Sequence, residues 1–126
     1  MTEAHRVLVV DDDADIRETI VEVLEDAGYH AVGAADGIEA LAQLRDPDDH
    51  WCVVLLDLMM PNMDGRAFRA HQLQDPALSP IPVVIVSAMN DVEDAADQLG
   101  VAAHVTKPVP LARLVELVDR FCHRAA

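Results

Sequence analysis

Apolar runs alternate with helical segments five times along the chain, and this alternation restricts the possible folds more than any other feature. The runs that predict strands are residues 6–10, 30–34, 53–56, 82–86 and 102–106, of which the second is the weakest. Helical spacing follows each run, over residues 14–27, from 36 to near 47, and over 65–74, 91–99 and 110–122. Strands joined by helical crossovers pair in parallel. The chain therefore predicts an α/β fold: a five-stranded parallel sheet, doubly wound by helices on both faces.

The stretch from Val53 to Gly65 contains the most informative strand. Its four apolar residues indicate a strand that is buried on both faces, and the run stops at a single acid, Asp57. Pro61 prevents further pairing, and Asp64 with Gly65 can begin a helix. Open α/β sheets place their chemistry at the carboxyl ends of strands, which is where Asp57 lies. An acid can also occur at a strand end by chance. Whether Asp57 is functional therefore depends on which residues follow the other strands.

The length of the chain indicates the number of domains, and its net charge argues against some classes of binding partner. A chain of 126 residues can form one domain with a proper core, and we expect a single domain over 1–126 with no output domain. The net charge of −14 argues against direct binding to nucleic acid or to an anionic membrane. No apolar segment is long enough to cross a bilayer, which favours a cytoplasmic protein. Cys52 and Cys122 each lie in an apolar run, and we expect both to be buried, reduced thiols.

Polar residues follow the predicted strands at the same end of each. Asp11 and Asp12 follow the first strand, Asp57 the third, Ser87 the fourth and Lys107 the fifth. The carboxyl ends of parallel strands share one edge, so these side chains should meet in one crevice. Lys107 is also the only lysine of the chain, all other cationic side chains being arginines. Each residue alone is unremarkable, and the joint placement is the specific signal.

This set of residues suits phosphoryl transfer. Three crowded carboxylates repel one another, and a hard divalent cation such as Mg²⁺ relieves the repulsion. An aspartate can act as a nucleophile and become an aspartyl phosphate, and Asp57 is the best-placed candidate. Lys107 and Ser87 could then meet the phosphoryl oxygens.

Four motifs resemble the receiver domain of two-component response regulators, over essentially the whole chain. They are VLVVDDDADIR at the first strand, VVLLDLMMPNMDG at the third, PVVIVSA at the fourth and HVTKP at the fifth. Together and at this spacing they are highly specific. The resemblance implies a flavodoxin-like fold with strand order 2-1-3-4-5. It also implies a signalling module, not an enzyme beyond self-phosphorylation and autodephosphorylation.

The resemblance implies a role for each site residue. Asp57 would accept a phosphoryl group from a sensor histidine kinase or a histidine phosphotransfer protein. Asp11, Asp12, Asp57 and the backbone carbonyl of Met59 would hold Mg²⁺. Lys107 would pair with Asp57 or its phosphate, and the Lys107-Pro108 bond would be cis.

The resemblance also implies a switch. Ser87 would move toward the phosphate, and the ring on the fifth strand would follow. A downstream protein target would then bind the face formed by the fourth helix, fifth strand and fifth helix.

The sequence departs from the family at two places. The ring of the switch is usually Tyr or Phe and here is His104, a smaller and more polar group, so the coupling to phosphate would be altered. An ordinary, partly exposed histidine that still rotates is the alternative. Met59 and Met89 take positions that flank the attacking water in the family, and neither can orient water. We therefore predict slow self-dephosphorylation, unless both are merely exposed loop residues.

Other functions remain as alternatives. A haloacid dehalogenase-like aspartyl-phosphate hydrolase also needs a D-x-D pattern after its first strand, which Asp11 to Asp13 contain, but the chain has no room for a cap domain. A nucleotide-binding module would need a glycine-rich phosphate loop, and neither common pattern is present. An adaptor that is never phosphorylated would not need the intact set of acids.

Overall fold

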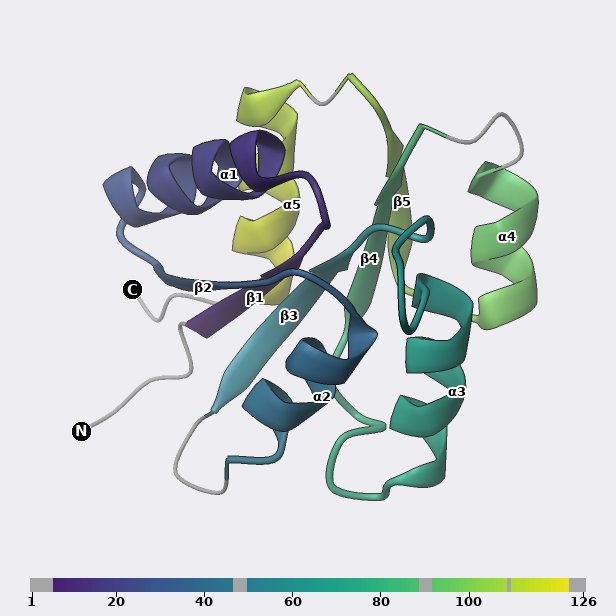
Figure 1. Cartoon of the computed structure of the whole chain (residues 1–126). Helices are drawn as coiled ribbons and strands as arrows, with labels where there is room; N and C mark the ends of the chain where they lie inside the picture. The colour runs from purple at the N-terminus through teal and green to yellow at the C-terminus, as the bar shows by residue number, and fades with distance from the viewer. Residues whose placement is uncertain (1–5, 47–49, 89–91, 109, 123–126) are drawn as a thin grey trace.

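The computed structural model describes residues 6–46, 50–88, 92–108 and 110–122. Strands and helices alternate along it in five pairs (Figure 1). The pairs are β1 (Arg6–Val10) and α1 (Ala14–Asp26), β2 (His30–Ala34) and α2 (Gly37–Leu44), β3 (Trp51–Leu56) and α3 (Gly65–Gln74), β4 (Val83–Ser87) and α4 (Val92–Leu99), and β5 (Ala103–Thr106) and α5 (Leu111–Phe121). The predicted elements are confirmed. Most ends shift by no more than two residues, but α2 ends at Leu44, before the predicted end near residue 47, which lies outside the described residues.

All strands pair in parallel, in the order β2-β1-β3-β4-β5. Helices α1 and α5 cover one face of the sheet, and α2, α3 and α4 cover the other (Figure 1). The predicted doubly wound, flavodoxin-like fold with strand order 2-1-3-4-5 is therefore confirmed. Because β3 lies at the centre, all six of its residues are buried, and the residue after it is placed at the middle of the carboxyl edge.

Acidic caps turn the chain from the sheet edge into three of the helices. The side chains of Asp13, Asp36 and Asp64 accept backbone N–H groups at the starts of α1, α2 and α3. Gly65 then brings α3 close to the sheet, since a Cβ at this position would lie 2.6 Å from the carbonyl oxygen of Asp57. Only glycine permits this approach, so the backbone of Asp57 is held between its strand and the next helix.

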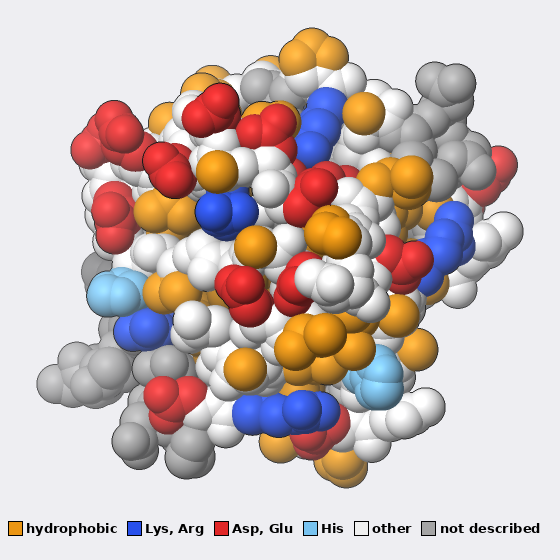
Figure 2. All heavy atoms as spheres, in the orientation of Figure 1, with side chains coloured by type: hydrophobic (Ala, Val, Ile, Leu, Met, Phe, Trp, Pro, Cys, Tyr) orange, Lys and Arg blue, Asp and Glu red, His pale blue; other side chains and the backbone are white. Residues whose placement is uncertain are grey.

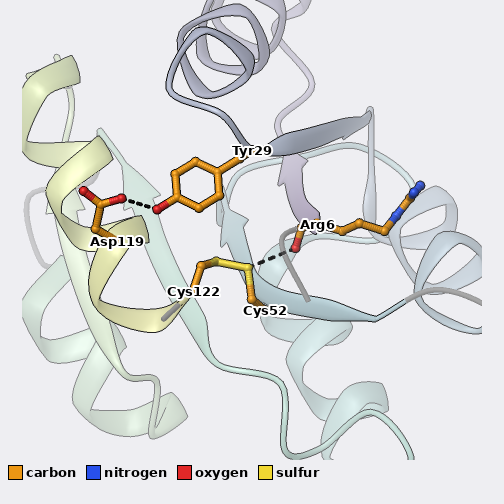
Figure 3. The surroundings of a disulfide bond; sticks show 5 residues. All are labelled: Arg6, Tyr29, Cys52, Asp119 and Cys122. Atoms are coloured by element: carbon orange, nitrogen blue, oxygen red, sulfur yellow. Dashed lines mark hydrogen bonds between the residues drawn. A yellow bond between two sulfur atoms is a disulfide. The ribbon is translucent and has the colours of Figure 1, made fainter. Parts of the chain in front are cut away.

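The two cysteines differ from the sequence-based expectation. Cys52 and Cys122 are buried as predicted, but they form a disulfide that joins β3 to the end of α5 (Figure 3). The cause is a β-bulge: Arg6 pairs with Trp51 and Val7 pairs with Val53, which leaves Cys52 as an extra residue. The bulge turns Cys52 to the same face as Val53, under α5. The expectation of reduced thiols was wrong because the sequence pattern does not reveal the bulge.

The described surface carries many acids and few large apolar side chains. Figure 2 shows acidic side chains gathered over α1, at the upper left of the view. The exposed acids of this helix are Asp15, Glu18, Glu22, Glu25 and Asp26. None of the helices in the described part of the chain combines the length and the apolar character that a membrane span requires.

Candidate functional site at the carboxyl edge of the sheet

Asp57 is held firmly at the end of the central strand. Its side chain is almost fully buried, with 6% of the residue exposed. Its backbone N–H donates to the carbonyl of Val10 (2.9 Å), which ties it to the end of β1. One carboxylate oxygen, Oδ1, accepts the backbone N–H of Met59 (3.2 Å), and the other, Oδ2, lies 3.2 Å from Lys107 Nζ. The carboxylate is therefore oriented by groups on both sides.

The two acids after β1 lie beside Asp57. Asp11 is buried and Asp12 is exposed. One oxygen from each of the three carboxylates lies within 4.8 Å of the other two, the one such group with metal-ligand potential among the described residues. Asp11 is fixed by its N–H, which donates to the carbonyl of Ala34 (3.1 Å), and by its Oδ1, which accepts the N–H of Asp13 (2.9 Å). The first strand thus brings two acids to the predicted place.

Lys107 connects the acids after β1 and β3 to the neighbouring strands β4 and β5. Its Nζ donates to Asp11 Oδ2 (2.8 Å) as well as to Asp57 Oδ2. Its backbone N–H donates to the carbonyl of Ser87 (2.9 Å), and Ser87 itself is fully buried at the end of β4. The Lys107-Pro108 peptide bond is cis, as the resemblance implied. Acids and lysine therefore converge as predicted, with Ser87 beside the lysine.

Burial and charge act against each other in this cluster. Burial raises the pKa of Asp57, and the negative charge of Asp11 adds to this, while the Met59 N–H and Lys107 act in the opposite direction. For Lys107, burial opposes the charged form, but the hydrogen bond to Asp11 and the charges of Asp57 and Asp11 outweigh it and raise the pKa of the ammonium. The three carboxylates of the cluster face a single ammonium group, so negative charge is in excess.

The acidic cluster could hold a divalent metal ion. Its carboxylate oxygens are the ligands that hard cations prefer, and the excess negative charge favours such an ion. A cavity of about 330 Å³ opens beside it and is lined by Asp12, Leu58, Met59, Met60 and Asp64. The cavity therefore adjoins Asp12, the exposed acid of the cluster, and the two residues that follow Asp57 in the chain.

A family model for the response regulator receiver domain matches residues 7–119 of this chain. The chain belongs to this family. Receiver domains are signalling modules rather than classical enzymes. The alternative of a haloacid dehalogenase-like hydrolase receives no support, since the receiver model accounts for nearly the whole fold and site.

Relatives and solved structures agree with this assignment. The phosphate regulon transcriptional regulatory protein PhoB of Escherichia coli K12 is 36% identical over 124 residues, which are 96% of this chain and 53% of PhoB. This receiver domain thus spans about half the length of that relative. A response regulator receiver protein from Pseudomonas putida has a TM-score of 0.85 at 33% identity, covering 95% of this chain and 99% of that one. The phosphorylated cyanobacterial phytochrome response regulator RcpA has a TM-score of 0.78 at 30% identity, with coverages of 97% and 96%.

His104, the predicted ring of the switch, lies on β5 of the receiver domain and is exposed. It pairs in register with Ile85 of β4, so both side chains lie on the face covered by α4. The ring is therefore on the predicted output side and outside the core. Met59 is also exposed, and Met89 lies outside the described residues.

Sequence reasoning missed one residue that supports the site. Arg17, on α1, donates from Nη1 to the carbonyl of Asp11 (2.8 Å). It crosses β2 at Gly33, where a Cβ would lie 2.9 Å from its Cδ. The signal was present as an arginine in the helix after the acids and a glycine in the second strand. Only the packing of α1 on β2 connects them.

Proposed function

We propose that this receiver domain accepts a phosphoryl group on Asp57. The observation that carries the proposal is a buried carboxylate held between Lys107 Nζ at 3.2 Å and two further acids, whose oxygens lie within 4.8 Å of its own. RcpA, which is similar in fold and 30% identical, was solved in a phosphorylated form and supports the proposal. The donor is a phosphohistidine of a sensor histidine kinase or of a histidine phosphotransfer protein.

The phosphoryl transfer needs no reactant besides Asp57 and the phosphohistidine donor. An oxygen of Asp57 attacks phosphorus, an acyl phosphate bond forms, and the P–N bond to the donor imidazole breaks with its electron pair moving to nitrogen. The ammonium of Lys107, which already donates to Asp57, then faces the negative charge of the phosphoryl oxygens. The hydrogen bond from the Met59 N–H orients the Asp57 carboxylate, and the bond from the Asp57 N–H to the Val10 carbonyl holds its backbone.

We propose Mg²⁺ as the cofactor, held by Asp11, Asp12, Asp57 and the backbone carbonyl of Met59. When bound, it neutralises charge on the phosphoryl group. Binding should stabilise the fold, by about 2.7 kcal/mol at a concentration one hundred times the dissociation constant. Thermal unfolding with and without Mg²⁺ measures this effect.

The matched variants for that measurement are Asp12→Asn and Asp13→Asn. Both remove one negative charge from the same loop, and the amide oxygen that Asp13→Asn introduces can still cap α1. Asp12→Asn should abolish most of the shift in melting temperature, whereas Asp13→Asn should retain it. Equal shifts in the two variants would exclude the proposed metal ligands.

We further propose that phosphorylation is read on the face formed by α4, β5 and α5. Ser87 bonds the phosphate, and His104 rotates inward as Ser87 moves. The partner is a downstream protein target, not nucleic acid or a membrane, which the acidic surface over α1 would repel (Figure 2). We propose that residues 1–126 form one receiver domain and that it acts in the cytoplasm. An identical rotamer of His104 with and without a phosphate mimic would contradict the switch.

The central experiment is incubation with Mg²⁺ and a small acyl phosphate donor, followed by intact-mass measurement. The parent chain should gain one phosphoryl group, and Asp57→Asn should gain none. Asp64→Asn is the matched control, because Asp64 lies at the same cavity and the new amide can still cap α3. It should be phosphorylated like the parent. An adduct on both the parent and Asp57→Asn, or on neither, would overturn the proposal.

A further inference from the structure

The disulfide between Cys52 and Cys122 joins two parts of the chain that are 70 residues apart in sequence. Their Cα atoms lie 5.1 Å apart, within the usual range for such bonds. Two features of the fold create this distance: the bulge turns Cys52 toward α5, and α5 ends at Cys122. The pairing is thus a product of tertiary structure.

The surroundings suit the thiols as well as the disulfide. Cys52 Sγ lies 3.3 Å from the carbonyl oxygen of Arg6, which could accept the hydrogen of a reduced thiol (Figure 3). Cys122 lies in the apolar core under α5, where a free cysteine behaves as a small hydrophobic residue. Reduction therefore leaves no new polar group buried without a partner, and the fold can persist in both states.

The bond also holds α5 at the end opposite to the candidate site. Asp57 directly follows β3 and contacts Lys107, which precedes α5. Cys52 lies at the start of β3, and Cys122 follows the last residue of α5. The strand and the helix are thus joined by an ion pair near one end and by a covalent bond at the other. Breaking the covalent bond releases the far end of α5 and leaves the ion pair intact.

Access to the sulfurs requires α5 to open. Only 7% of Cys52 and 1% of Cys122 are exposed, so a reductant cannot reach them in the closed state. Cys122 is the C-cap of α5, and unfolding of the last helical turn would expose it. The Tyr29 hydroxyl donates to the carboxylate of Asp119 in this turn and opposes the opening (Figure 3).

We propose that Cys52 and Cys122 form a reversible redox pair that controls how firmly the C-terminal end of α5 is held to the sheet. Glutathione disulfide is a sufficient oxidant: one cysteine thiolate attacks it and releases one glutathione, and the second cysteine attacks the mixed disulfide and releases another. Two electrons and two protons pass to the two glutathione molecules. Disulfides in reducing compartments are usually transient, which agrees with the expected cytoplasmic location.

The first measurement follows the redox state of the whole chain. The protein is equilibrated at graded ratios of glutathione to glutathione disulfide, quenched in acid, and alkylated before intact-mass measurement. We expect one transition, from a species with no alkyl group to one with two, while the circular dichroism spectrum stays that of the folded chain. Tyr29→Phe should be reduced severalfold faster than the parent, because it lacks the bond to Asp119.

The second measurement is amide hydrogen exchange in the two states. Amides of the last turns of α5 should exchange about tenfold faster or more in the dithiol form, with α2 unchanged. The double variant Cys52→Ala, Cys122→Ala should exchange at one rate in oxidising and reducing buffer. A bond that persists until the chain unfolds, thiols that never oxidise, cross-linked dimers, or equal exchange in both states would each overturn the proposal. No step involves phosphoryl transfer, so this test is independent of the proposed function.

Discussion

Met59 exposes 66% of its surface next to Asp57, and its thioether cannot orient water as an amide can. We expect Met59→Asn to speed the loss of the phosphoryl group severalfold, because the new amide can hold a water near the acyl phosphate. Decay of the phosphorylated mass after removal of the donor measures the rate. Leu73→Asn is the control, since Leu73 is similarly exposed but lies in the last turn of α3. Unchanged or slower decay in Met59→Asn would contradict the prediction.

Asp36 links α2 to the loop after β3. Its carboxylate accepts the Glu39 N–H (3.0 Å) and the Asn62 side-chain amide (2.8 Å), and these bonds, in that order, lower its pKa despite burial. A carboxyl group whose pKa is lower in the folded state stabilises the fold above its unfolded pKa, and this contribution is lost as the pH falls through the folded pKa.

Asp36→Asn keeps an acceptor at this position but does not titrate. We expect the parent to be more stable than Asp36→Asn near pH 6, and this advantage to shrink toward about pH 2. Urea unfolding at several pH values measures it. A difference that stays constant over this range would show that the charge of Asp36 does not matter.

At the scale of whole elements, Arg69 connects α3 to the end of α4. Its guanidinium donates to the carbonyls of Leu99 (3.1 Å) and Gly100 (2.9 Å), and to Gln72 Oε1 (2.7 Å). Burial lowers the pKa of this guanidinium because it disfavours the charged form. The three hydrogen bonds offset that cost. It satisfies carbonyls that the end of a helix leaves without partners.

We expect Arg69→Ala to lower the free energy of unfolding by about 2 to 3 kcal/mol, because several charged hydrogen bonds are lost. Hydrogen exchange should rise most in α4. Arg66→Ala, on the same helix, is the control: the Arg66 side chain makes a long, exposed bond to Gln98 (3.4 Å), and we expect a change within about 0.5 kcal/mol. Similar losses in both variants would mean that the buried bonds from Arg69 to Leu99 and Gly100 add no particular stability.

Local chemistry explains why the elements were largely predictable. The apolar run of β3 is buried on both faces, as its pattern indicated, and Asp13 caps α1 as its side chain favours. The roles of Arg69 and Gln72 were not predictable, because their partners are backbone carbonyls of loops and of a helix end, which for Arg69 lie 30 and 31 residues away. A buried arginine in an amphipathic helix gives no local sign of the carbonyls it will meet.

For the molecule as a whole, the disulfide joins two distant segments by a covalent bond. A cross-link across 70 residues limits the unfolded chain and should contribute about 4 kcal/mol by loop entropy. We therefore expect a strong reductant to lower the melting temperature of the parent and to leave that of Cys52→Ala, Cys122→Ala unchanged. Calorimetry in matched buffers measures both. An unchanged melting temperature in the fully reduced parent would mean that the bond adds no net stability.

The sequence alone determined the architecture and the composition of the candidate site. Alternating apolar runs and helical spacing are local patterns, and a parallel sheet necessarily gathers its strand ends, so Asp11, Asp12, Asp57 and Lys107 could be placed together. Tertiary structure alone decided the disulfide, because it depends on a bulge in the pairing of β1 with β3 and on where α5 ends. Patterns of burial follow from the order of residues, whereas contacts across many residues depend on register and packing.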